Sequence, residues 1–488
     1  MKSDGLKKNL FFQFSYQFIV LVVPLIMAPY LTRTLGKEAI GIYSYTYSIA
    51  YYFVLVCMLG IVKHGQRIIA SVKDDPIQLR KTFWSLFTLH FIVSSAVFIF
   101  YCIACVSFLN ENQYVYFAQS LYVLSALFDI TWFFYGIEKF KTVVIRNTMV
   151  KITELLLTVL FVKAPEDLII YTIIMSGALL VSQISLLPAA IRIVKPITFS
   201  TYDISKHIKP MLVLSVSVLA ISLYTVFDKT LLGMMTNTNN VALYEYANKI
   251  ITIPKLFVIV IGTVLFPRAC NSIAVGDIGG AKRYYNYSLM VVYFISFGSI
   301  FGLLGIADLF SIKYYGDAFA ECGKIIKAMA PLVLIIGLGD TFRMQYLIPL
   351  KKDAQYTVCA ILNAIINIVI SFALIPKYGV YGAVIGTTAA ELFGVLYQGF
   401  LVRGYVNIKK TITQMIPFAV SGVLMFGGME IIKTFANDSI GHLLLQILSG
   451  ALIYVICTVV WLLIISENKD TYRGIIKASL KKERMTKG

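Results

Sequence analysis

The 488-residue sequence is poor in charge. Lys, Arg, Asp and Glu make up 14% of it and hydrophobic residues 58%, whereas soluble domains average about 25% charged residues. Apolar runs of about 20 residues, the length of a helix that crosses a bilayer, recur along the whole chain. These runs leave no room for a sizeable soluble domain. The composition therefore predicts an all-α polytopic membrane protein.

Motifs of ATP-driven pumps and metal sites are also missing. The chain has no G-x-x-x-x-G-K-[ST] motif for nucleotide phosphates. Its four histidines form no i, i+4 pair. Cys102 and Cys105 make a lone C-x-x-C within a predicted membrane helix, where small apolar packing is the better interpretation. We expect no cofactor, no metal and no catalytic residue, and hence not an enzyme.

The apolar runs predict about fourteen transmembrane helices. Their approximate boundaries follow from length and hydropathy. Several of these helices contain charged residues. The predicted helices are 10–32, 39–62, 83–107, 114–135, 147–163, 168–191, 210–235, 241–265, 286–308, 323–347, 355–376, 380–402, 412–433 and 441–465.

The distribution of basic residues predicts the orientation. Most of the 43 Lys and Arg residues fall in alternate segments, which places both termini and these segments in the cytoplasm. The net charge of +18 therefore indicates orientation and affinity for anionic membrane lipids, and it does not predict nucleic acid binding. The opposite turns hold only Arg33, Lys37, Lys163, Lys313, Lys377 and Lys433.

Two internal similarities predict a repeated architecture. IYSY at 42–45 resembles LYEY at 243–246, and FDITWFFYGIEKFK at 128–141 resembles GDTFRMQYLIPLKK at 339–352. Parallel repeats of this kind occur in transporters, so we expect two six-helix lobes followed by two C-terminal helices. The corresponding division is an N-lobe at 1–195, a C-lobe at 196–405, two helices at 406–466 and a basic cytoplasmic tail at 467–488.

Six stretches resemble Wzx-type polysaccharide flippases of the multidrug/oligosaccharidyl-lipid/polysaccharide exporter superfamily. They occur in the family's order over nearly the whole chain. The resemblance implies fourteen helices in two lobes around a central cavity. The stretches are LTRTLGKEAIGIYSY (31–45), WFFYGIEKFK (132–141), FDKTLLG (227–233), ALYEYANKI (242–250), LFPRA (265–269) and IPKYGVYGAVIGTTAAELF (375–393).

The resemblance also implies a function. Such a protein transfers undecaprenyl-diphosphate-linked oligosaccharide from the inner to the outer leaflet of the bacterial plasma membrane, for surface polysaccharide biosynthesis. Ion-coupled alternating access, with H+ or Na+ as coupling ion, is the mechanism we expect, and the polymerase and other polysaccharide assembly proteins are candidate partners. One alternative is an ion-coupled drug or small-solute exporter of the same superfamily. A membrane polysaccharide polymerase is a weaker alternative, because the longest outer loop, about 309–322, is short.

Four charges around the turn between predicted helices 7 and 8 are the sharpest candidates. Asp228 and Lys229 precede this turn, and Glu245 and Lys249 follow it at similar depth. Insertion of each ion at a membrane helix centre costs about 2.5–3.5 kcal/mol. We therefore expect these residues to have oppositely charged partners or a function in transport. We expect Lys229 and Lys249 to bind the substrate headgroup while Asp228 and Glu245 balance their charge. The competing interpretation is a salt-bridge network that only stabilises the lobe.

Further charges form a second group of candidates. Asp129 and Asp340 occupy repeat-related positions toward the cytoplasm, and Arg343 follows Asp340. We expect Arg343 to bind the headgroup and both acids to balance charge or bind the coupling ion; snorkelling toward water is an equal alternative. Glu391, near the membrane midplane, is either an ion-coupling site or a satisfied core acid. Arg33 matches the flippase motif as a headgroup ligand, with an interfacial anchor as the alternative.

Overall fold

The computed structural model describes residues 20, 22–107, 111–198, 201–434 and 439–465. These residues form helices joined by short turns, and this part of the chain contains no strand. Ten of its helices are long and apolar enough to cross a membrane, or eleven if one bent pair counts as a span. The expected all-α membrane fold is confirmed. The number fourteen and the orientation of the termini stay predictions, and the segments 1–9 and 467–488 lie outside the described residues.

The chain folds into two compact units. The first comprises Met1–Tyr246 and Ala364–Gly386, and the second comprises Ala247–Asn363 and Thr387–Gly488. Helices α11, α15 and α16 contribute residues to both units. This partition follows from packing, whereas the predicted lobe boundaries follow from the repeats and stay predictions.

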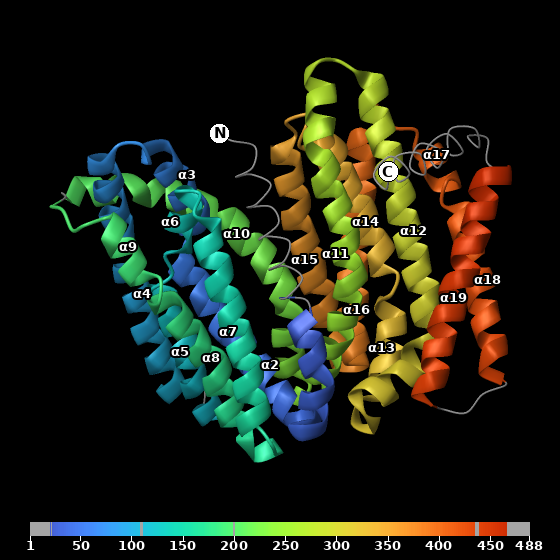
Figure 1. Ribbon diagram of the computed structural model, residues 1–488, viewed down its shortest axis with the longest axis horizontal. Coiled ribbons are helices and arrows are strands. Elements are labelled where there is room, and N and C mark those ends of the chain that lie inside the picture. The colour runs from blue at the N-terminus through green and yellow to red at the C-terminus, as the bar shows by residue number, and fades with distance from the viewer. Residues whose placement is uncertain (1–19, 21, 108–110, 199–200, 435–438, 466–488) are drawn as a thin grey trace, which may run out of the picture. The chain divides into compact units, whose positions relative to one another are not determined.

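The first unit contains a helix at 22–34 and the helices up to α10 (Figure 1). They are α2 (Gly36–Met58), α3 (Ile61–Val72), α4 (Pro76–Ser107), α5 (Gln113–Leu127), α6 (Thr131–Gly136), α7 (Phe140–Phe161), α8 (Leu168–Ile184), α9 (Leu187–Ile193) and α10 (Thr201–Met235).

The remaining helices follow in chain order. They are α11 (Thr238–Ala274), α12 (Ile278–Phe310), α13 (Cys322–Met329), α14 (Leu332–Phe342), the π-helical η4 (Arg343–Leu347), α15 (Asp353–Tyr378), α16 (Val380–Val402), α17 (Ile408–Thr413), α18 (Ile416–Thr434) and α19 (Ile440–Val460).

Several predicted helices are broken where glycine or proline interrupts the backbone. Gly60 adopts a left-handed conformation (φ 70°) between α2 and α3. Pro188 is the second residue of α9, Pro331 precedes α14, and Pro417 is the second residue of α18. Proline lacks an N–H and clashes with the preceding turn, so a helix readily ends before it. One of these breaks bends a span by 40°, between Asp317–Met329 and Leu332–Leu347.

The predicted ends of helices 241–265 and 286–308 are wrong, because they leave 266–285 outside both helices. In the structure α11 continues to Ala274 and α12 begins at Ile278, so most of this segment is helical (Figure 1). Asp277 closes the turn because its carboxylate accepts a hydrogen bond from the Gly280 N–H at 2.8 Å, as expected for a helix N-cap. The apolar pattern therefore ends before the helix, which continues to Ala274.

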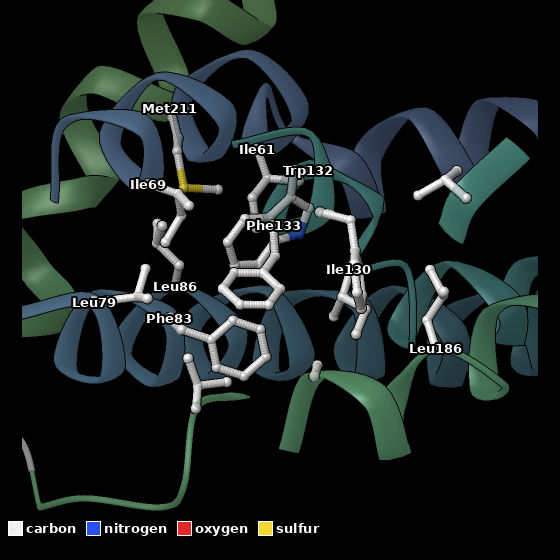
Figure 2. Packing of buried hydrophobic residues seen from close by; sticks show 14 residues of the cluster. Ile61, Ile69, Leu79, Phe83, Leu86, Ile130, Trp132, Phe133, Leu186 and Met211 are labelled. Atoms are coloured by element: carbon white, nitrogen blue, oxygen red, sulfur yellow. The ribbon is translucent and has the colours of Figure 1, made fainter. Parts of the chain in front are cut away.

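A buried aromatic cluster holds the first unit together near the α3 and α6 helices (Figure 2). Trp132 and Phe133 on α6 pack with Phe83 on α4, and all three are essentially inaccessible. Gly65 on α3 permits this contact, because a Cβ there would lie 2.7 Å from the Trp132 ring. The indole N–H of Trp132 donates to the Asp129 carbonyl at 3.0 Å. This buried donor is therefore hydrogen-bonded, as is usual for tryptophan.

The second unit has its own core between α12, α14 and the segment around α17. Tyr285 and Tyr293 on α12 are buried. The Tyr285 hydroxyl lies 2.9 Å from the Thr411 hydroxyl, and Tyr293 donates to the Thr411 carbonyl at 2.8 Å. These bonds satisfy the phenolic groups inside an otherwise apolar cluster.

Candidate functional site

Asp228 lies in a polar pocket of the first unit. It is 4% exposed on α10, and its carboxylate accepts hydrogen bonds from three neutral donors. They are the Tyr244 hydroxyl on α11 at 2.7 Å, the Asn367 amide at 3.2 Å and the Ser371 hydroxyl at 3.3 Å, the last two on α15.

Helix spacing and one glycine build this pocket. Asn367 and Ser371 are an i, i+4 pair, so both side chains project from one face of α15. Gly386 on α16 lies against Ser371, and a Cβ at Gly386 would lie only 2.1 Å from the Ser371 hydroxyl oxygen. The glycine therefore allows α16 to lie close to α15 at the level of Ser371.

Lys229 and Glu245 form an ion pair beside this pocket. Their Nζ–Oε2 distance is 2.8 Å, and the side chains are 15% and 20% exposed. The pair links α10 to α11 within the first unit. The next residue of α10, Thr230, is hydrogen-bonded to Ser48 and Tyr52 of α2, each at 3.0 Å. The structure thus brings three of the four predicted outer charges into one region.

Lys249, the fourth of these charges, lies one turn after Glu245 on α11 and is half-buried. It belongs to the second unit. Its role as a headgroup ligand stays a prediction.

Asp129 has local hydrogen bonds in the first unit. Its carboxylate accepts from the Thr131 N–H at 2.9 Å and from the Thr131 hydroxyl at 2.5 Å. It therefore stabilises the turn between α5 and α6, in the manner of an Asx turn. Lys151 and Glu154, which follow in the same unit, form an ion pair at 2.6 Å with Glu154 buried. These contacts favour a structural role for Asp129.

Asp340 has charged surroundings in the second unit. It pairs with Arg343, whose guanidinium also donates to the Tyr356 hydroxyl at 2.8 Å. Asp340 is buried against α11 at Gly262, where a Cβ would collide with its second carboxylate oxygen. Arg343 begins the π-helical η4, a backbone form that is often found at functional sites. The repeat-related Asp129 and Asp340 thus differ in their partners.

Glu391 on α16 lies within electrostatic range of Lys255 on α11. Lys255 donates a hydrogen bond to the Asn248 side-chain oxygen at 3.3 Å. Both Lys255 and Glu391 are partly exposed.

Arg33 lies in the last turn of the helix at 22–34 and is exposed. Its guanidinium donates to the Pro29 carbonyl at 3.3 Å. This bond fits the interfacial anchor, while binding of substrate by Arg33 stays a prediction. Among the residues that the structure describes, no group of three or more His, Cys, Asp or Glu side chains could hold a metal ion.

Sequence reasoning missed the neutral members of the site. Tyr244, Asn367 and Ser371 surround Asp228, yet only the charged residues were singled out. A signal was present, because Asn363, Asn367 and Ser371 recur at four-residue intervals in an otherwise apolar helix. Such a stripe indicates a polar helix face directed away from lipid.

Comparison with known sequences places residues 6–271 in the family model described as polysaccharide biosynthesis protein. A protein of Shigella dysenteriae that is provisionally named as an O-antigen transporter is 24% identical over 80% of this chain and 99% of its own length. A protein of Escherichia coli (strain K12) with the same provisional name is 22% identical over 79% of this chain and 94% of its own length.

Comparison with solved structures shows the fold. A lipid II flippase MurJ in an inward closed conformation superposes with a TM-score of 0.76 at 18% identity, covering 93% of this chain and 99% of that one. An inward-facing multidrug resistance MATE family transporter of the MOP superfamily superposes with a TM-score of 0.59 at 11% identity, covering 80% of this chain and 95% of that one. The chain therefore shares the fold of these membrane transporters.

Proposed function

Because the chain belongs to the polysaccharide biosynthesis protein family, we propose that it is a transporter that flips lipid-linked oligosaccharide across the bacterial plasma membrane. The substrate is an undecaprenyl-diphosphate-linked repeat unit, which moves from the inner to the outer leaflet. The O-antigen transporters of similar sequence and the fold shared with a lipid II flippase support this substrate class. The protein acts as a carrier and not as an enzyme.

The charges on α10 and α11 are the observation that carries the proposal. Asp228, Lys229 and Glu245 lie in helices of an otherwise apolar chain, and intramembrane ions of this kind usually serve transport. The ammonium groups of Lys229 and Lys249 suit phosphate oxygens, which are bound best by charge-assisted hydrogen bonds. When no substrate is present, Glu245 balances Lys229 at 2.8 Å.

The oxygen-rich pocket at Asp228 is the candidate for the coupling ion. A carboxylate, an Asn amide and a Ser hydroxyl together offer the oxygen ligands that a hard cation such as Na+ prefers. The same carboxylate could instead take up H+. Binding of either ion neutralises Asp228 and thereby changes its hydrogen bonds to Tyr244 and α15. This coupling rests on the contacts at Asp228.

Gene deletion tests the transport proposal. We expect surface polysaccharide to be lost while complete lipid-linked oligosaccharide accumulates on the cytoplasmic leaflet, and a plasmid copy to restore export. If assembly of the glycan on the lipid stops instead, the protein is an enzyme and the proposal fails. Unimpaired surface polysaccharide with altered drug resistance would indicate the drug exporter.

A further inference from the structure

A chain of hydroxyl groups joins α2 to α10 beside the ion pocket. Thr230 on α10 is 5% exposed, and its hydroxyl donates a hydrogen bond to the Ser48 hydroxyl at 3.0 Å. A threonine hydroxyl has a single hydrogen to donate. The Tyr52 hydroxyl, which also lies 3.0 Å from the Thr230 oxygen, is therefore the donor of the second bond. Ser48 in turn donates to the Tyr45 carbonyl at 2.7 Å, so each hydroxyl of the chain donates one hydrogen bond.

The same face of α2 packs tightly against the end of α10 and the start of α11. Gly41 and Tyr45 precede Ser48 by seven and three residues, so all three positions share this face. A Cβ at Gly41 would lie 1.9 Å from the Thr238 carbonyl oxygen, and a Cβ at Gly233 would lie 2.1 Å from the Tyr45 ring. We call this contact, together with the hydroxyl chain, the α2 seam. It has no room for further side-chain atoms at either glycine.

Thr230 follows Asp228 by two residues on α10. Consecutive residues of an α-helix are about 100° apart around its axis, so the two side chains project from nearly opposite sides of α10. Asp228 accepts hydrogen bonds from Tyr244 on α11 and Asn367 on α15, whereas Thr230 bonds to α2. A rotation of α10 that changes the bonds at Asp228 therefore also moves Thr230 relative to α2.

We propose that Thr230 is a positioning residue for transport, which links occupancy of the ion pocket at Asp228 to the α2 seam. This inference rests on the proposed function, to which the ion pocket belongs. Binding of the ion changes the hydrogen bonds at Asp228, turns α10 and thereby alters the bonds from Thr230 to α2. The turn between α10 and α11 faces outward in the predicted orientation. The ion therefore controls the packing of α2 at its outer end.

Distances between two spin labels on the purified full-length protein test the inference. In a chain whose seven native cysteines are replaced, labels at Glu38→Cys on α2 and Met234→Cys on α10 report on the seam, since both positions are exposed beside it. We expect a short and a long distance population, whose ratio changes several-fold when the coupling ion, Na+ or H+, is added. Thr230→Val should raise the long population roughly tenfold, the usual effect of losing two hydrogen bonds, and should abolish the response to the ion. Thr230→Ser retains the hydroxyl and should restore both properties.

A matched control separates coupling from general stability. Thr263 is exposed on α11, and its hydroxyl donates to the Ile259 carbonyl of its own helix at 3.1 Å, so Thr263→Val should give the wild-type populations and response. If Thr230 only stabilises the first unit, Thr230→Val lowers thermal stability while the folded protein still responds to the ion. That response overturns the inference alone. If the protein with Thr230 intact responds to neither Na+ nor H+, the ion pocket of the proposed function fails as well.

Discussion

At the scale of single residues, the chain keeps its intramembrane ions in contrasting environments. Asp228 is buried and accepts hydrogen bonds from Tyr244 and Asn367, and Lys229 forms an ion pair with Glu245. Removal of one partner from a buried pair typically costs about 3–5 kcal/mol, while neutralising both partners can be harmless to folding. Paired substitutions therefore separate scaffold roles from substrate roles.

The first prediction concerns Asp228 and Lys249. We expect the combination of Asp228→Asn and Lys249→Gln to insert at normal abundance but to lose export, because the cation for the diphosphate is gone. Lys249→Arg should retain part of the activity, since a guanidinium also binds phosphate. Immunoblots of membranes and surface polysaccharide staining measure the two properties. Full export by the neutral double variant would show that Lys249 is not a substrate ligand.

The second prediction concerns the ion pocket. Ser371→Ala removes a hydroxyl that lies 3.3 Å from Asp228, so the Na+ concentration for half-maximal transport should rise several-fold at unchanged abundance. Ser449→Ala is a matched control, because Ser449 on α19 is partly exposed and its hydroxyl donates to the Leu445 and Gln446 carbonyls of its own helix. Transport that does not depend on Na+ but responds to a pH gradient would assign H+ as the coupling ion. An unchanged response to both ions would remove this pocket from the mechanism.

At the scale of helices, close approach of α15 and α16 depends on a missing side chain. Gly386→Val should destabilise the first unit by about 1–3 kcal/mol, the usual cost of overpacking, because the new Cβ would meet the Ser371 hydroxyl at 2.1 Å. Membrane abundance and thermal stability measure the effect. Gly427→Val, where nothing lies within 4 Å of a Cβ, is the control. Equal stability of the two variants would contradict the packing described for α15 and α16.

Sequence patterns predict the existence of the helices better than their ends. Long apolar runs predicted an all-helical membrane protein, and ten or eleven helices of the described residues are long and apolar enough to cross a membrane, because lipid demands about 20 apolar residues. They could not give the extension of α11 to Ala274, since helices continue in water when charged residues and caps support them. Likewise, the charge of Asp228 identified it as a candidate site residue. Asn367 could not be identified in this way, because its role depends on which face of α15 contacts α10. Such pairings arise from tertiary packing and leave only a weak trace in one sequence.

At the scale of the whole molecule, the charge distribution predicts the orientation. In a chain whose seven native cysteines are replaced, Asn239→Cys should react with an impermeant thiol reagent added to intact cells. Asp74→Cys should react only after permeabilisation, because its segment is rich in basic residues that remain in the cytoplasm. The reverse pattern would invert the topology and with it the direction of export.

Reconstitution tests the central claim most directly. Purified protein is placed in liposomes that carry undecaprenyl-diphosphate-linked oligosaccharide in the inner leaflet, and the oligosaccharide that becomes accessible to an external glycan-cleaving enzyme is followed with time. We predict rapid exposure with the wild-type protein, and exposure at the protein-free rate with the double variant that combines Asp228→Asn and Lys249→Gln. Exposure at the protein-free rate with correctly folded wild-type protein would contradict the assignment of this chain as a flippase.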